Sequence, residues 1–356
     1  MGWRPWQPGT LKTKNSKNHK FRKLSDVVQL LKLSPLEMAR TRLNFRYSLG
    51  CRPMRWLIGI IGLTLGVLGG CEAIPEIPVG EQAILVHDSV YHHLVVSQDD
   101  TCRYLRFGYG RVQGAMGLDD PVALKLPYTA YLALGLVFNR PRRVLMIGLA
   151  GGAMVRFLQE YFPDVNVDVV EIDPDVVAVA ERYFGVQNAI HHRIHIGDGR
   201  VFVKQTRERY DWVILDGFHA DTVPHHLTTV EFMEEVKGLL QPQGVVTANI
   251  ARLGPGILYR SMIRTLAQVF PQVYLFPVPN RGNIVTVATL SDKRRSGESI
   301  AKDIGQLKAR TNRALDLLEA RGSLLEEKPV VVDAPVLTDD YAPVDLLRYQ
   351  EGIYGF

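Results

Sequence analysis

The sequence predicts an α/β protein with a mostly parallel sheet, preceded by a small antiparallel β domain. Between residues 121 and 295, continuous Val, Ile and Leu runs alternate with segments of helical pattern. This alternation is typical of parallel strands covered by helices on both faces. Between residues 82 and 120 the apolar runs are short and turn residues separate them, as in antiparallel hairpins. With 356 residues, 46% of them hydrophobic, the chain can bury a sizeable core.

The small β domain is expected over residues 82–120. Gln98-Asp99-Asp100 is the predicted turn of a hairpin, and Pro75 and Pro78 mark a linker over residues 72–81. The expected strands lie within AILVHD, YHHLVVSQ, TCRYLRFG and RVQGAM.

The larger domain is expected over residues 121–295, beginning with a helix at Tyr128–Phe138. Further helices should start at Ala153, at Pro174 after the capping Asp173, and at Thr228, where Thr228-Thr-Val-Glu231 matches a capping box. Residues 296–356 are expected to form a helical and loop extension. The expected strands lie within RVLMIG, VNVDVVEID, RIHIGD, YDWVILD, GVVTANI, VYLFPVP and NIVTVATL.

Charge is distributed unevenly along the chain. Residues 1–55 hold 13 Lys and Arg against 2 Asp and Glu, whereas the remainder holds 29 basic against 35 acidic residues. The folded body is therefore mildly acidic, and no basic stripe of the kind that binds nucleic acid is expected. Residues 1–53 are interpreted either as a basic, disordered leader or as sequence upstream of a start at Met54.

Residues 54–71 resemble a secretion signal. Arg55 is followed by an apolar run and then by small residues ending at Cys71, and LGGC resembles a bacterial lipoprotein box. We expect lipidation at Cys71 and a membrane-associated or exported protein, or a cytoplasmic one if the segment is not a functional signal. A short buried or interfacial helix is the alternative, since the run is too short to span a bilayer comfortably.

The carboxyl ends of the predicted parallel strands carry the candidate chemistry, because ligands bind beyond those ends in such sheets. A glycine loop, Gly148-Leu-Ala-Gly151-Gly152, follows the first strand. Three later strands end on acids, namely Glu171, Asp198 and Asp216. Each feature alone also fits an ordinary turn or a helix cap. Together they predict a nucleoside site, in which an acid at the position of Glu171 accepts hydrogen bonds from ribose.

VLMIGLAGG, VVEIDPDVV, IGDGRVF and YDWVILDGF together resemble the spermidine/spermine synthase family, the aminopropyltransferases. RVQGAM, LPYTAYL, HHLTTVEF and LTDDYAPV resemble its spermidine-synthase-like branch, in which the catalytic domain is often joined to membrane segments. The likeness spans roughly residues 82–290. It implies a class I S-adenosylmethionine-dependent methyltransferase-like Rossmann sheet with a small N-terminal β domain, and commonly a homodimer.

The resemblance also implies site roles. Asp216 matches the family's catalytic aspartate, Tyr128 a tyrosine of the substrate pocket, and His219 and Asp221 could grip the amine or relay a proton. The nucleoside donor would be bound by Glu171 at the ribose, by Asp198 at the adenine and by Gln113, Gly148, Ala150, Gly152 and Gly199 around them.

Three positions depart from the family pattern. The glycine loop has Leu149-Ala150 where the family usually carries an acid, Tyr-His-Glu becomes Tyr128-Thr129-Ala130, and the second acid after Asp216 is displaced to Asp221. These changes bear on recognition of the amine more than on the nucleoside.

No metal site is expected. Cys51, Cys71 and Cys102 lack metal-ligand spacing, and the paired histidines are neighbours that would point to opposite faces of a strand. The acidic segment LTDDYAPV either closes over the pocket or caps the sheet.

Three functions follow as hypotheses. The first is transfer of an aminopropyl group from decarboxylated S-adenosylmethionine to a polyamine, with Asp216 as general base. The second is methyl transfer from S-adenosylmethionine itself. The third is a non-catalytic nucleoside- or polyamine-binding lipoprotein.

Overall fold

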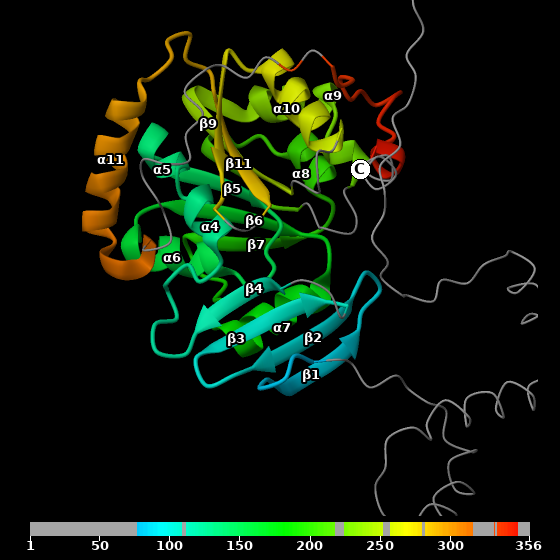
Figure 1. Ribbon diagram of the computed structural model, residues 1–356, viewed down its shortest axis with the longest axis vertical. Helices are drawn as coiled ribbons and strands as arrows, with labels where there is room; N and C mark the ends of the chain where they lie inside the picture. The colour runs from blue at the N-terminus through cyan, green and yellow to red at the C-terminus, as the bar shows by residue number, and fades with distance from the viewer. Residues whose placement is uncertain are drawn as a thin grey trace, which may run out of the picture. The chain divides into compact units, whose positions relative to one another are not determined.

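A computed structural model describes residues 77–108, 112–217, 224–251, 257–279, 282–315, 331 and 333–347 (Figure 1). The chain divides into two compact units, Met1–Ile74 and Pro75–Phe356. The described residues all belong to the second unit.

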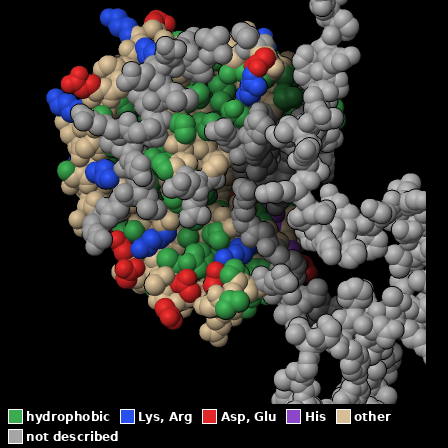
Figure 2. Space-filling model, viewed as in Figure 1, with side chains coloured by type: hydrophobic (Ala, Val, Ile, Leu, Met, Phe, Trp, Pro, Cys, Tyr) green, Lys and Arg blue, Asp and Glu red, His purple; other side chains and the backbone are tan. Residues whose placement is uncertain are grey.

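The four-stranded sheet of the second unit is antiparallel throughout, in the order β1-β2-β3-β4, as the sequence predicted. In the turn between β2 and β3, Asp99 accepts hydrogen bonds from the backbone N–H groups of Thr101 and Cys102, both at 2.7 Å. Apolar and charged side chains are mixed over this sheet in Figure 2. Its strands are β1 (Gln82–Asp88), β2 (His93–Gln98), β3 (Cys102–Phe107) and β4 (Val112–Gly117).

The seven-stranded sheet has the order β10-β11-β9-β8-β5-β6-β7. Neighbours from β9 through β7 pair in parallel, while β11 is antiparallel to both β9 and β10. This is the Rossmann-like sheet expected from the family resemblance. Its strands are β5 (Arg143–Ile147), β6 (Asn166–Glu171), β7 (His192–Ile196), β8 (Tyr210–Leu215), β9 (Leu240–Ala251), β10 (Gln272–Pro277) and β11 (Asn283–Thr289).

Helices cover both faces of this sheet, and each face has its own apolar core (Figure 1). One face is covered by α4 (Pro127–Leu132), α5 (Gly135–Phe138), α6 (Ala153–Tyr161), α7 (Pro174–Phe184) and α11 (Gly297–Arg310). The other is covered by α8 (Gly199–Gln205), α9 (Val230–Leu239) and α10 (Ile257–Val269). Two 3₁₀ turns span His225–Leu227 and Asn312–Leu315.

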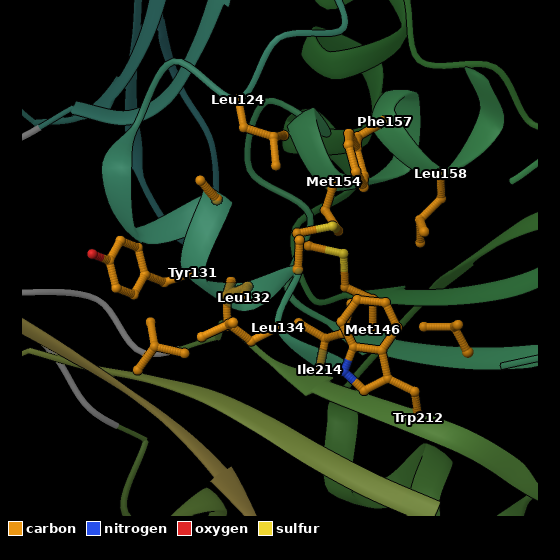
Figure 3. Packing of buried hydrophobic residues seen from close by; sticks show 14 of the residues in the cluster. Leu124, Tyr131, Leu132, Leu134, Met146, Met154, Phe157, Leu158, Trp212 and Ile214 are labelled. Carbon is orange, nitrogen blue, oxygen red and sulfur yellow. The ribbon is translucent and has the colours of Figure 1, made fainter. Parts of the chain in front are cut away.

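Strand β8 shows why parallel strands of this sheet have sequences that are unbroken apolar runs. Trp212 and Ile214 point into one core, and Val213 and Leu215 point into the other. Figure 3 shows Trp212 and Ile214 beside Met146 of β5, Leu132 of α4 and Leu134 just before α5. The fit is tight at Gly135, where an added Cβ would lie 2.2 Å from the Trp212 ring. A strand buried on both faces gains stability from every side chain, so no polar alternation is needed.

Three helix predictions need correction. The helix expected over Tyr128–Phe138 is two short helices, α4 and α5. The cap of α9 is Thr229, whose hydroxyl accepts from Phe232 N–H, whereas Glu231 bonds the backbone N–H of Asp339 instead of closing a capping box at Thr228. Helix α10, with an apolar face of Leu258, Met262 and Leu266, is an element that the sequence prediction omitted.

The segment of residues 333–347 is anchored to the second face of the sheet. Asp339 receives both terminal nitrogens of Arg200, at 2.6 and 2.7 Å, and the hydroxyl of Thr229 at 2.7 Å. Backbone Leu337 accepts from Val230 N–H at 2.8 Å. The hydrogen bonds from Arg200 lower the pKa of Asp339 to about 2, so this anchor is ionic at neutral pH.

No helix among the described residues is long and apolar enough to cross a bilayer. Residues 54–71 and Cys71 lie outside the described part, so lipidation, export and membrane attachment stay predictions from the sequence.

Candidate active site

The predicted strand-end residues lie along one edge of the large sheet. Ile147 of β5 pairs with Val170 of β6 and with Leu215 of β8, and Glu171 of β6 pairs with Ile196 of β7. Because these strands are parallel neighbours in the order β8-β5-β6-β7, the residues that follow them emerge at the same edge. From one side to the other these are Asp216, the glycine loop, Glu171 and Asp198. Chain order reverses between β5 and β8, which is where such sheets bind ligands.

The glycine loop lies close to its neighbours at both ends. At Gly148, with φ of 94°, an added Cβ would lie 2.6 Å from the carbonyl oxygen of Asp216. An added Cβ at Gly114 of β4 would lie 2.7 Å from the backbone nitrogen of Gly151. Ala150 also has a positive φ, 46°, an uncommon conformation for a residue with a side chain. The loop is thus held between Asp216 on one side and the small sheet on the other.

Glu171 is buried at the end of β6, and protein donors already hold both of its oxygens. Its Oε2 accepts from Leu149 N–H at 2.8 Å, and its Oε1 accepts from Asp173 N–H at 3.1 Å. Burial raises the pKa of Glu171, although the two backbone hydrogen bonds oppose this. Each carboxylate oxygen can accept a further hydrogen bond, so a ribose hydroxyl would be an additional partner.

Asp173 joins this acid to the small sheet. Its carboxylate caps α7 by accepting from Asp175 N–H at 2.9 Å. It also accepts from the Ser89 hydroxyl at 2.5 Å and contacts Nδ1 of His92 at 3.0 Å, both in the turn between β1 and β2. These hydrogen bonds, against the effect of burial, lower the pKa of Asp173. The small sheet is therefore bonded directly beside the proposed ribose acid.

Asp198 is both the N-cap of α8 and the partner of a histidine. Its Oδ1 accepts from Val201 N–H at 2.9 Å, and its Oδ2 lies 2.8 Å from Nε2 of His226. Burial works to raise the pKa of Asp198, but these hydrogen bonds outweigh it and the pKa is lowered. Gly199 has a packing reason as well, because an added Cβ would lie 2.6 Å from Ile147. Asp198 thus serves as a helix cap and as the partner of a histidine, and its contact with adenine stays a prediction.

Asp216 follows β8 and differs from the other acids in its surroundings. Its Oδ1 accepts from the side-chain amide of Asn249 at 3.0 Å. The Tyr128 hydroxyl lies beside the carboxyl and also donates to the backbone oxygen of Gln113 at 3.2 Å. Burial raises the pKa of Asp216 to about 7, and the hydrogen bonds from Asn249 and Tyr128 only partly offset it. Burial, followed by the charge of Asp216, holds the pKa of Tyr128 well above its usual value. Asp216 can therefore take or release a proton near neutral pH.

Two residues beside Asp216 were missed by the sequence prediction. Asn249 lies near the end of β9, and Asn283 begins β11 and donates to Oδ1 of Asn249 at 2.9 Å. The signal available in the sequence was an amide within the mostly apolar run GVVTANI. Asn249 is buried in the structure, and a buried polar side chain needs a hydrogen-bond partner. His226, the partner of Asp198, was likewise not among the predicted site residues.

The predicted residues fall into two groups. The strand-end set, with Gln113 and Tyr128 from β4 and α4, is brought to one edge. His219 and Asp221 lie outside the described residues, as does Cys71. Within the described ranges, no cluster of three or more His, Cys, Asp or Glu side chains has the arrangement of a metal site.

Known proteins are similar to this chain in sequence and in fold. Residues 128–298 match the spermine/spermidine synthase domain. A polyamine aminopropyltransferase from Vibrio vulnificus is 31% identical over 295 residues, covering 78% of this chain and 96% of that protein. One from Chromobacterium violaceum is 33% identical over 219 residues, covering 60% of this chain and 83% of that protein.

The fold agrees with that relationship. The crystal structure of a probable spermidine synthase from Corynebacterium glutamicum matches with a TM-score of 0.55 at 18% identity, covering 73% of this chain and all of that one. The edge of the sheet described above thus lies in a fold shared with such enzymes. The chain belongs to the polyamine aminopropyltransferase family, a family of transferases.

Proposed function

We propose that the protein transfers the aminopropyl group of decarboxylated S-adenosylmethionine to a polyamine, with Asp216 as the general base. The observation that carries this proposal is the position and pKa of Asp216. It lies where chain order reverses in the sheet, its pKa is about 7, and its side-chain partners among the described residues are neutral. A base with a pKa near the working pH transfers protons most efficiently.

The chemistry needs little beyond a base and precise placement. The amine nitrogen attacks the propyl carbon bonded to the sulfonium, and the C–S bond breaks with its electron pair going to sulfur. Methylthioadenosine leaves as a neutral thioether, so no acid is required. The amine proton passes to Asp216. Free alkylamines have a pKa near that of lysine, about 10.4, so a carboxylate that accepts this proton makes the nitrogen nucleophilic.

The nucleoside would be held by groups that already lie along the same edge. Glu171 would bind the ribose hydroxyls and Asp198 the adenine amino group. Gln113 and the loop containing Gly148, Ala150 and Gly152 would flank the sulfur and ribose.

Methyl transfer from S-adenosylmethionine is the second candidate, and one observation favours it. Leu149 is 2% exposed, and Ala150 offers no carboxylate. The described part of the loop thus lacks an acid for the terminal amine of the decarboxylated donor. A nucleoside- or polyamine-binding role without catalysis is the remaining alternative.

The full-length protein can be incubated with each donor and a panel of amines, and the nucleoside product identified. We expect methylthioadenosine from the decarboxylated donor. S-adenosylhomocysteine would instead indicate methyl transfer, and no product with either donor would favour a binding protein.

Substitution of the base provides the first mutational test. Asp216→Asn should lower kcat by ~10²–10⁴-fold, because the amide cannot accept the proton, while donor binding measured by calorimetry persists. Asp164→Asn, at an exposed turn, is the matched control and should retain full activity. Full activity of Asp216→Asn would remove Asp216 from the mechanism.

A further inference from the structure

A chain of side-chain amides leads to the proposed base. Asn283 Nδ2 donates to Asn249 Oδ1 at 2.9 Å, and Asn249 Nδ2 donates to Asp216 Oδ1 at 3.0 Å. The three residues come from β11, β9 and the end of β8, which are successive neighbours in the sheet. Asn249 is only 6% exposed, so water competes little for its amide.

The order of donors and acceptors in this chain determines which way Asn249 faces. An amide has one accepting end and one donating end, whereas an ionised carboxylate can only accept. Because the Asn283 amide nitrogen occupies the oxygen of Asn249, the nitrogen of Asn249 is directed at Asp216. Asn283 therefore favours one of the two amide orientations of its neighbour.

That orientation matters because the two ends of the amide act on Asp216 in opposite ways. An N–H donor stabilises the ionised carboxylate, and a carbonyl oxygen in its place would favour the protonated acid. The hydrogen bond from Asn249 already opposes the effect of burial on the pKa of Asp216. Without that donor, a larger fraction of the base would carry a proton at neutral pH and could not accept one from the amine.

Few other groups near Asp216 could stabilise its ionised form. On α4, Tyr128 is the titratable side chain that faces it, and β9 contributes Asn249. The end of β5 contributes backbone at Gly148. No charged side chain of the described residues acts on its pKa. A neutral amide chain thus supplies the stabilisation that a cation would otherwise give, without repelling a positively charged amine.

We propose that Asn249 is a positioning residue for Asp216, and that Asn283 acts through it by fixing the orientation of its amide. The Asn283–Asn249 pair favours the ionised form of Asp216, occupies its Oδ1, and leaves the remaining lone pairs of the carboxylate for the acceptor amine. This inference rests on the proposed role of Asp216 as the general base.

The test measures the pH profile of kcat/KM for the amine in the full-length protein. In Asn283→Ala, Asn249 is free to turn its oxygen to Asp216, and the inflection assigned to Asp216 should move upward by about one pH unit. Asn283→Asp should move it further, because a carboxylate at this position attracts the Asn249 nitrogen away from the base. Asn283→Gln, which keeps a donor, should return the inflection toward its original pH.

A double-mutant cycle shows whether Asn283 acts through Asn249. In the Asn249→Ala background the inflection is already raised, and Asn283→Ala should add no further shift. Asn166→Asp, near the opposite end of the parallel strands on β6, introduces the same charge and should leave the profile unchanged. Melting curves check that each variant is folded, and the Gln variant provides a folded comparison if the Ala variant is unstable.

Two results would overturn the inference. One is an unchanged inflection in Asn283→Ala, with a shift only in Asn283→Asp, since that pattern indicates a simple charge effect. The other is an equal additional shift from Asn283→Ala in the absence of Asn249. Failure of the proposed function would look different, because Asp216→Asn itself would then retain activity.

Discussion

Asp198 and Asp216 follow parallel strands of the same sheet, β7 and β8, yet their surroundings shift their pKa values in opposite directions. Asp198 caps α8 and contacts His226, and its pKa is lowered. Asp216 has neutral partners, and burial raises its pKa to about 7. The difference comes from what surrounds each carboxylate.

Under the proposed function, this contrast would separate a binding group, Asp198, from a reacting group, Asp216. A carboxylate held ionised by a helix N-terminus and a histidine is a constant hydrogen-bond acceptor, which suits recognition of an amino group. A carboxylate near its midpoint at neutral pH can exchange a proton, which suits a base. Environments that move the pKa values of two acids apart are a general way to divide such roles.

The largest expected effect is on the pH dependence of turnover. Below pH 7 the ionised fraction of Asp216 falls tenfold per pH unit, so about 1% remains at pH 5 and the rate should drop by ~100-fold. Protonation of the free amine contributes a constant slope to the plot of log(kcat/KM) against pH. Protonation of Asp216 should increase that slope by one below about pH 7. Donor affinity, measured by calorimetry, should stay nearly flat from pH 6 to 8 because the pKa of Asp198 is lowered. A profile whose slope does not change near neutral pH would contradict a base with a pKa of about 7 at Asp216.

The second effect is on stability and has opposite signs at the two acids. Between the unfolded pKa of Asp216, 3.8, and its folded pKa, about 7, the folded state holds the extra proton, so the free energy of unfolding falls as pH rises. Asp216→Asn should therefore stabilise the protein by about 1–3 kcal/mol at pH 8, a gain that shrinks as pH falls from 7 to 4.

Asp198 is the matched comparison for that measurement. Its lowered folded pKa contributes stability that is present above the unfolded pKa and is lost as pH falls through the folded pKa. Asp198→Asn should destabilise the protein slightly at pH 8, by ~0.5 kcal/mol, since Asn also caps helices well. Thermal melting of both variants at pH 5 and pH 8 measures the signs, and shifts in the same direction at pH 8 would refute the assignment.

The smallest effect is expected from His226→Ala. Loss of the contact at 2.8 Å leaves Asp198 without a partner at Oδ2, and the carboxylate can turn away from the adenine site. Donor affinity should fall by roughly 3–10-fold, which corresponds to one hydrogen bond. The kcat at saturating donor should stay within twofold, and a large loss of kcat would mean that His226 acts in the chemical step instead.

The strands were predictable from the sequence because burial in the core requires apolar residues at most of their positions. Each of the β5, β6 and β8 runs fills two cores at once, so the apolar pattern is strong. Helix boundaries were less predictable. Thr228 and Thr229 are equally good caps by residue type, and the contact of Glu231 with Asp339, 108 positions away, favours the second. Such a long-range contact leaves no local pattern.

The site shows the same limit. Glu171, Asp198 and Asp216 were found because strand ends are marked by a change from apolar to polar residues. Asn249 lies within its strand and was read as part of it, and its partner Asn283 begins another strand 34 residues later. The pKa of Asp216 depends on burial by segments distant in sequence, so it could not be inferred from YDWVILD alone.

The contact between Gly114 and Gly151 limits how this protein can be recombined. Backbone meets backbone there, so a side chain on the small sheet would displace the loop beside the proposed sulfur site. A chimera that takes the small sheet from one relative and the large sheet from another must keep both glycines and their register. The two sheets are thus a single exchangeable part for protein engineering, even though each has its own hydrogen-bonded strands.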